Sequence, residues 1–200
     1  MSTYDSQYYF IRFPSNKEGI PSLLADHNTV NRRFEYEQQD EGSPPLVFHN
    51  GMKNEYLAAG TSIAKPHDIL FDGTNIVVTT DIHRELLTFN TPDMYTHPTV
   101  YIHDDGEWYE DYWYITFEKR FDCWDRENSD YDPEPDGFGD FIYYEVDQFS
   151  LNSELLDNTP LNQRLLFKMG GASDAFVTCH ESIKHLFDND GTTLIAVNDW

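Results

Sequence analysis

The sequence predicts an α+β fold, with a mainly antiparallel sheet and a few short helices. Strand-like segments outnumber helical ones, and no sustained alternation of strand and helix points to a parallel sheet. One pattern occurs twice: residues 76–87 and 175–187 each run from a strand through a small polar cap into an amphipathic helix. Two copies are too few for a solenoid, so the pattern indicates a reused strand–cap–helix unit. Because no clear linker divides the chain, residues 1–200 are expected to form a single domain.

The sequence of the N-terminal part predicts two strands separated by a segment without regular secondary structure. Residues 8–13 are rich in aromatic and β-branched side chains and precede Pro14, which is typical of a strand and its end. Residues 31–45 are polar and charged and finish in Gly-Ser-Pro-Pro, which favours a loop. A short strand is expected over residues 46–48, before the turn signal Asn50-Gly51.

The middle of the chain predicts the first strand–cap–helix unit and then a β-hairpin. A strand over residues 75–80 leads into a helix over 81–87, with Thr79, Thr80 or Asp81 as the N-cap. Residues 100–102 and 108–121 read as strands joined by the acidic turn Asp104-Asp105-Gly106.

Alternation along the second hairpin strand predicts one buried and one outward face. The side chains expected to be buried are Trp113, Ile115, Phe117 and Phe121. Those expected to point the other way are Tyr112, Tyr114, Thr116 and Glu118.

The C-terminal part is expected to begin with a loop over residues 122–140, which is dense in acidic residues, Pro and Gly. Its later strands and helices are expected over residues 141–144 (strand), 151–163 (short helix or turn), 165–169 (strand), 176–178 (strand), 181–187 (helix) and 193–197 (strand).

The charge balance is the most unusual property of the chain. It has 13 Lys and Arg against 36 Asp and Glu, so its net charge is 13 − 36 = −23. A field of this sign repels nucleic acid and anionic membranes, so neither is expected as a partner. It attracts basic proteins and cations and accelerates encounter with them. A solubility device or an adaptation to salt is the alternative explanation.

Cysteine usage and apolar runs predict a cytoplasmic protein. Cys123 and Cys179 lie far apart and outside any CxxC pattern, which fits a reducing compartment. The first 13 residues have no basic segment followed by an apolar one, so no secretory signal is expected. The longest apolar runs, such as residues 76–78, are too short to cross a bilayer.

Two segments of the sequence carry residue types that can bind metal ions. The segment from Asp132 to Asp140 imitates the start of a calcium loop, with acidic residues at alternate positions and Gly137 at the sixth. Its twelfth position is Tyr143 instead of the bidentate Glu such a loop needs, so an acidic surface loop is favoured over a calcium-binding module. His180 and His185 are five residues apart, whereas a helical zinc pair needs four.

Catalytic motifs do not occur in the sequence: it has no GxSxG, P-loop or GxGxxG pattern at the start of a helix. Paired carboxylates suited to sugar hydrolysis arise by chance in so acidic a chain, although a small hydrolase is a rival hypothesis. We therefore expect a binding protein that is not an enzyme and needs no cofactor.

Acidic and aromatic residues concentrate together between residues 104 and 147, with 16 Asp and Glu against three bases. Aromatic side chains supply binding area, while carboxylates steer a basic partner and pair with it. The candidate partner-binding residues are Asp104, Asp105, Glu107, Trp108, Glu110, Asp111, Asp125, Glu127, Asp130, Tyr131, Asp132, Glu134 and Asp136. Asp122, Asp125 and Ser129 are alternatively expected to hold a turn through side-chain to backbone hydrogen bonds.

At these residues the sequence resembles a known family. The run Phe121-Asp122-Cys123-Trp124-Asp125-Arg126-Glu127-Asn128-Ser129, after the aromatic strand at 112–115, is similar to the central motif of the immunity protein 11 family. That motif has an Asp, two residues, a second Asp and a nearby Ser. The C-terminal block from Leu166 to Ile195 also resembles the closing pattern of the family, and the likeness covers roughly residues 70–198.

The resemblance implies a bacterial immunity protein of the polymorphic-toxin and type VI secretion kind. Such a protein binds its cognate toxin, often a nuclease, in the cytoplasm and blocks it. The charge agrees with this implication, because an acidic protein can occupy a basic nuclease site in place of phosphates. A calcium-binding module or a general protein-interaction module is the alternative.

Overall fold

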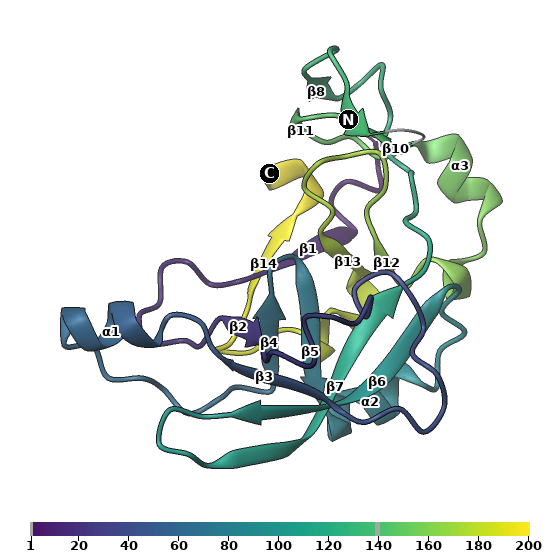
Figure 1. Cartoon of the computed structure of the whole chain (residues 1–200). Coiled ribbons are helices and arrows are strands. Elements are labelled where there is room, and N and C mark those ends of the chain that lie inside the picture. The colour runs from purple at the N-terminus through teal and green to yellow at the C-terminus, as the bar shows by residue number, and fades with distance from the viewer. Residues whose placement is uncertain (1, 139–140) are drawn as a thin grey trace.

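The computed structural model describes residues 2–138 and 141–200 and confirms the α+β class with mainly antiparallel sheets (Figure 1). The larger sheet has six strands in the order β2-β3-β6-β7-β5-β4, and only β3 and β6 pair in parallel. A bridge between Ser22 and Phe71 brings its two outer strands together, so the sheet is strongly curled. Its strands are β2 (Leu23–Ala25), β3 (Leu46–Asn50), β4 (Ile69–Asp72), β5 (Asn75–Thr79), β6 (Met94–Ile102) and β7 (Trp108–Phe117).

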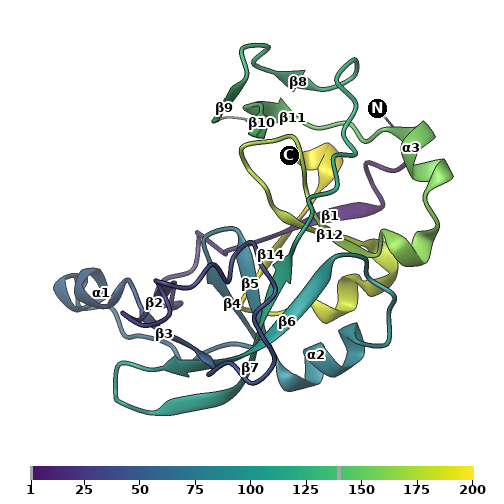
Figure 2. The same ribbon diagram turned by 45° about the vertical axis from the view of Figure 1, so that its right-hand side comes forward.

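A four-stranded antiparallel sheet joins the two ends of the chain (Figure 2). Its order is β12-β13-β1-β14, so the N-terminal strand β1 (Tyr8–Arg12) lies between two C-terminal strands. The other three strands are β12 (Leu166–Lys168), β13 (Val177–His180) and β14 (Thr193–Ala196).

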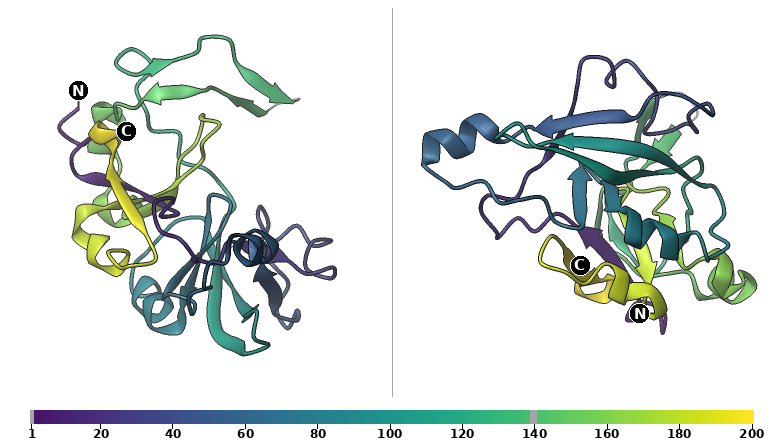
Figure 3. Two further views of the ribbon diagram at one scale, coloured as in Figure 1. Left: turned by 90° about the vertical axis from the view of Figure 1, so that its left-hand side faces the viewer. Right: turned by 90° about the horizontal axis from the view of Figure 1, so that it is seen from below.

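The acidic segment that was expected to be a loop over residues 122–140 instead contributes to a projecting β-arm (Figure 3, left). In this arm β8 (Asp130–Tyr131) pairs with β11 (Val146–Gln148), and β9 (Asp136–Phe138) pairs with β10 (Phe141–Tyr143). Residues 122–129, which lead into the arm, remain irregular as expected.

Both strand–cap–helix units are present, but they end in different helices. In the first, β5 continues into α2 (Thr80–Leu86) with Thr79 at the N-cap position. In the second, β13 continues into the 3₁₀-helix η2 (Glu181–Leu186), and the His180 ring accepts a hydrogen bond from the Ser182 N–H. The remaining helices are α1 (Lys53–Ala59), α3 (Ser153–Asn158), η1 (Leu161–Gln163) and η3 (Val197–Asp199). In the part of the chain described, no helix has the length and apolar character needed to cross a membrane.

Apolar cores cover both faces of β7, so the expected division into a buried and an outward face is wrong. Ile115 and Phe117 pack into a core shared with the four-stranded sheet, as expected. Tyr112 and Tyr114 are also buried, in a second core on the opposite face. This face is covered by the irregular segment before β3, whose Phe34 carbonyl accepts a hydrogen bond of 2.6 Å from the Thr116 hydroxyl.

Two other expectations for this strand also need correction. Trp113 is only partly buried, and it stacks on the ring of His83 with 4.0 Å between ring centroids. Phe121 lies beyond the end of β7, where it bridges to Met169.

Candidate functional site

The candidate partner-binding residues lie on two separate surfaces and not on one acidic face (Figures 1 and 2). The first, which we call the hairpin tip, comprises residues 104–111 at the β6–β7 turn. The second, the motif surface, comprises residues 122–136 at the base and edge of the β-arm. Strand β7 and the chain after it carry the sequence from one end of the molecule to the other, which separates the two groups.

The hairpin tip is anchored through Asp104. Its carboxylate accepts a hydrogen bond of 3.0 Å from the Asn50 side chain and lies 3.7 Å from the Lys53 ammonium, so it is largely enclosed. The next carboxylate, Asp105, accepts a 2.9 Å bond from the Glu107 N–H. This backbone bond, with the side chain of His103, holds the pKa of Asp105 below its usual value. Both acids therefore order the turn.

The other members of the hairpin tip face solvent. Glu107 accepts a hydrogen bond of 2.9 Å from the Tyr109 hydroxyl and lies 3.6 Å from the Lys65 ammonium. Trp108 is 60% exposed, and Glu110 and Asp111 are also exposed. The tip thus presents an indole among carboxylates.

The motif surface begins with a turn held by its own side chains. Asp125 accepts hydrogen bonds from the Glu127 N–H at 2.9 Å and from the Asn128 side chain at 2.7 Å. The bond from Asn128 is the main cause of the lowered pKa of Asp125. The Ser129 hydroxyl accepts a 2.9 Å bond from the Ser150 N–H. Asp125 and Ser129 therefore hold the turn through side-chain to backbone hydrogen bonds, as the alternative interpretation expected. Asp122, the third residue of that interpretation, instead accepts hydrogen bonds from the Arg126 side chain.

Arg126, which the sequence interpretation did not select, closes this turn over the core. Its guanidinium donates to both carboxylate oxygens of Asp122, at 2.5 and 2.6 Å, and lies over the ring of Trp124. Trp124 is buried and donates through its indole N–H to the Gly170 carbonyl. Gly171 has a positive φ, and a side chain there would collide with Arg126 and Asp122.

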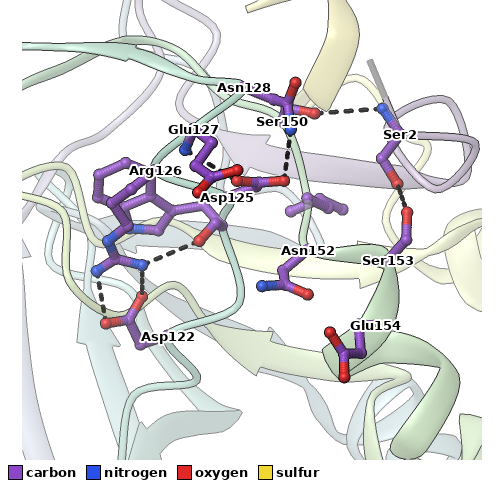
Figure 4. A pocket seen from close by; sticks show the side chains of 12 residues that line it. Ser2, Asp122, Asp125, Arg126, Glu127, Asn128, Ser150, Asn152, Ser153 and Glu154 are labelled. Carbon is purple, nitrogen blue, oxygen red and sulfur yellow. Dashed lines mark hydrogen bonds and ion pairs between the residues drawn. The ribbon is translucent and has the colours of Figure 1, made fainter.

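A polar groove of about 580 Å³ lies beside this turn (Figure 4). Its walls are Asp122 and residues 124–128 on one side and residues 150–154 on the other, with Ser2 at one end. Ser2 links the walls to the N-terminal segment, since its N–H donates to the Ser150 hydroxyl and its hydroxyl lies 2.8 Å from that of Ser153. The carboxylates that line the groove are Asp122, Asp125, Glu127 and Glu154. The groove can accept a cationic side chain, although several of its acids are already hydrogen-bonded.

The rest of the motif surface lies on the β-arm. Tyr131 is only partly exposed, because its ring packs 5.0 Å from that of Trp124 and 5.3 Å from that of Tyr144. It therefore attaches the arm to the core. The candidate carboxylates on the arm are all exposed: Asp130, Asp132, Glu134 and Asp136.

Within residues 2–138 and 141–200, no three His, Cys, Asp or Glu side chains come together in a way that suits a metal ion. The segment compared with a calcium loop ends at Asp140, which lies outside the described residues. Cys123 and Cys179 are both buried free thiols.

No protein-family model matches the chain, and the comparison with curated proteins gave no match.

Proposed function

We propose that this protein is an immunity protein, a stoichiometric inhibitor that binds a cognate antibacterial toxin with a basic, nuclease-type domain. It would occlude the active site or substrate cleft of that domain in the cytoplasm of the producing cell. The toxin would be an effector of a polymorphic-toxin or type VI secretion system, as the resemblance implies. On this proposal the protein acts by binding and needs no cofactor.

The observation that carries the proposal is the uncompensated acidic surface. Even if every Lys and Arg neutralised one acid, 36 − 13 = 23 acids would remain. Among the described residues, seven of the 13 bases already form ion pairs: Lys17, Arg33, Lys53, Lys65, Arg84, Lys119 and Arg126. Three others, Arg12, Arg164 and Lys184, lie over aromatic rings. The surface therefore offers carboxylates to a partner and few cations.

Order in the acidic turns also supports binding over a purely solubilising role. At the hairpin tip Asp104 and Asp105 hold the turn, and on the motif surface Asp125 does so. Carboxylates on ordered turns lose little conformational freedom on binding, so a basic partner gains more from each contact. Solubility alone does not need such order.

Co-expression with the neighbouring gene tests the proposal. If the protein is an immunity protein, the open reading frame immediately upstream encodes a toxin whose C-terminal domain stops growth when expressed alone in the cytoplasm. Co-expression of this chain restores growth, and the two proteins co-purify in a 1:1 complex. A toxic domain that kills equally well in the presence of this chain and does not co-purify with it would contradict the proposal.

A further inference from the structure

Four side chains form a row across one end of the six-stranded sheet. Leu24 of β2 is paired with His49 of β3, His49 with Ile102 of β6, and Ile102 with Trp108 of β7. Residues that are paired in register point to the same face of a sheet. The row therefore runs continuously over four adjacent strands.

The row faces solvent, although its members are mainly apolar. Leu24 and Trp108 are each 60% exposed, His49 is exposed and Ile102 is half-buried. Farther along the same face, Ile115 packs against the four-stranded sheet, so the core ends before it reaches the row. The sheet thus extends past the elements that cover it.

The opposite face of these strands is fully occupied by the core. Phe48 and Tyr101, which are next to His49 and Ile102 in sequence, point to that face and are completely buried. Packing of the core against this opposite face therefore fixes the position of the strands that carry the row. A rigid apolar strip of this kind suits docking, because few groups have to be ordered on binding.

Helix α1 lies beside the turn of the β6–β7 hairpin, close to the end of the row (Figure 3, right). The acids of the hairpin tip flank Trp108 on both sides in sequence, with Asp105 and Glu107 before it and Glu110 and Asp111 after it. Helix α1 begins three residues after β3 and has no buried side chain among the described residues. It is held at its start by the bond between Asn50 and Asp104 and by the contact of Lys53 with Asp104.

We infer that the row Leu24–His49–Ile102–Trp108, with the acidic hairpin tip beside it, is the surface on which the basic toxin domain docks. This inference rests on the proposed function and selects the hairpin tip over the motif surface. Stable interfaces have an apolar, aromatic centre and a polar rim, and the row with its carboxylates has this composition. The acidic residues beside the row favour a basic partner over a second copy of this chain, because two copies, each with a net charge of −23, repel each other.

A pair of matched double variants tests the surface. Leu24→Ser/Trp108→Ser removes the two apolar side chains at the ends of the row, each of which is 60% exposed. Leu87→Ser/Ile142→Ser is the control, since these residues are 60% and 61% exposed and lie on other parts of the molecule. All four side chains are mostly in water, so neither variant is expected to unfold the protein. The probe is the purified C-terminal domain encoded immediately upstream, and the readouts are the dissociation constant and the restoration of growth.

The row variant is expected to weaken binding by at least about thirtyfold, as the loss of a central aromatic residue does, while the control stays within about threefold of wild type. Equal binding by the row variant and wild type would overturn the docking surface and leave the proposed function standing. If wild type itself neither binds nor protects, the proposed function fails, and the inference fails with it. A dimer of the free chain that dissociates in the row variant would also overturn the assignment, because the row would then join two copies.

Discussion

The guanidinium of Arg126 lies 3.7 Å from the centroid of the Trp124 ring. The N–H groups of the same guanidinium donate to both carboxylate oxygens of Asp122, so the turn over residues 122–126 is closed by an arginine stacked on a buried indole. The planar guanidinium can stack on the Trp124 ring and pair with the Asp122 carboxylate at the same time, so both interactions stabilise the turn.

Replacement of Arg126 by Ala should lower the free energy of unfolding by about 1–2 kcal/mol, since it removes a cation–π contact and a two-fold ion-paired hydrogen bond. The effect stays moderate because both charged side chains are partly in water, which screens the pair. Arg126→Lys should recover only part of the loss, because an ammonium cannot stack and pair in the same plane. Urea unfolding measures these changes, with Arg84→Ala as the exposed control, expected to change stability by less than about 0.5 kcal/mol. Equal losses of stability in Arg126→Ala and Arg84→Ala would contradict a stabilising contact between Arg126 and the Trp124 ring.

Asp5 should be a main polar support of the N-terminal region. It is 1% exposed, and it accepts hydrogen bonds from the N–H groups of Ser2 and Leu151, both at 2.7 Å, and from the Ser150 hydroxyl at 3.1 Å. Asp5→Ala would leave these buried donors without an acceptor, so the free energy of unfolding should fall by about 3 kcal/mol. Chemical denaturation checks this value, with the exposed Asp174→Ala as control. A loss below about 1 kcal/mol would show that water replaces the carboxylate.

Lys168 predicts a pH dependence of stability in the alkaline range. It is buried between the two sheets, where it donates to the Asn75 side chain, and burial is the main cause that lowers its pKa to about 8. Arg120 lowers this pKa further, while Glu35 and Asp72 oppose the change. In the unfolded chain the amine keeps its ordinary pKa of 10.5. Between pH 8 and 10.5 the unfolded state therefore binds more protons, and the contribution of Lys168 to the free energy of unfolding rises with pH.

The difference in free energy of unfolding between wild type and Lys168→Met isolates this contribution. From pH 8 to pH 10.5 the free energy of unfolding of wild type should rise by about 3 kcal/mol relative to that of Lys168→Met. Below pH 7 the difference between the two proteins should be constant. The tyrosines and cysteines that also titrate in this range are common to both proteins and cancel in the difference. Lys119→Met, at an exposed lysine, is the control and should show no such slope. A flat difference for Lys168→Met would mean that water reaches the amine in the folded protein.

Association with the toxin domain should be fast at low salt and slow at high salt. If the acids at the hairpin tip attract a basic partner as proposed, the attraction is screened when the Debye length falls from about 14 Å at 0.05 M salt to about 4 Å at 0.5 M. The association rate constant should fall at least about tenfold over this range, as stopped-flow mixing can show. An unchanged rate constant would remove the electrostatic part of the proposal.

Neutralisation of equal charge at the two acidic surfaces compares them directly. Glu107→Gln/Glu110→Gln/Asp111→Asn removes three charges at the hairpin tip. Glu127→Gln/Asp132→Asn/Glu134→Gln removes three at the motif surface. If the toxin docks at the row, the first triple variant should slow association more than the second, because steering is strongest for charges beside the contact. The reverse order would favour the motif surface.

Sequence reasoning located the hairpin at the acidic turn because a glycine-containing turn between two β-favouring segments is a local signal. The prediction that β7 has one buried and one outward face was wrong, because Tyr112 and Tyr114 are covered by the polar segment before β3. The composition of that segment indicates only a loop and does not show that it packs on the sheet. Sequence reasoning also missed Arg126, whose role depends on Trp124 and Gly171, and Gly171 is 45 residues away in sequence. No signal at position 126 itself distinguishes this arginine from a solvated one.

The sequence by itself determined the α+β class, the main turns, the acidic excess and the aromatic content of the hairpin. These are properties of composition and of residues close together in the chain, so local preferences decide them. Only the tertiary structure decided that the candidate acids occupy two surfaces, that Lys168 is buried, and that Leu24, His49, Ile102 and Trp108 form one exposed row. Such facts depend on the register between strands far apart in sequence and on which faces other segments cover. A shift of one residue in that register would have pointed the side chains of the row to the opposite face of the sheet, into the core.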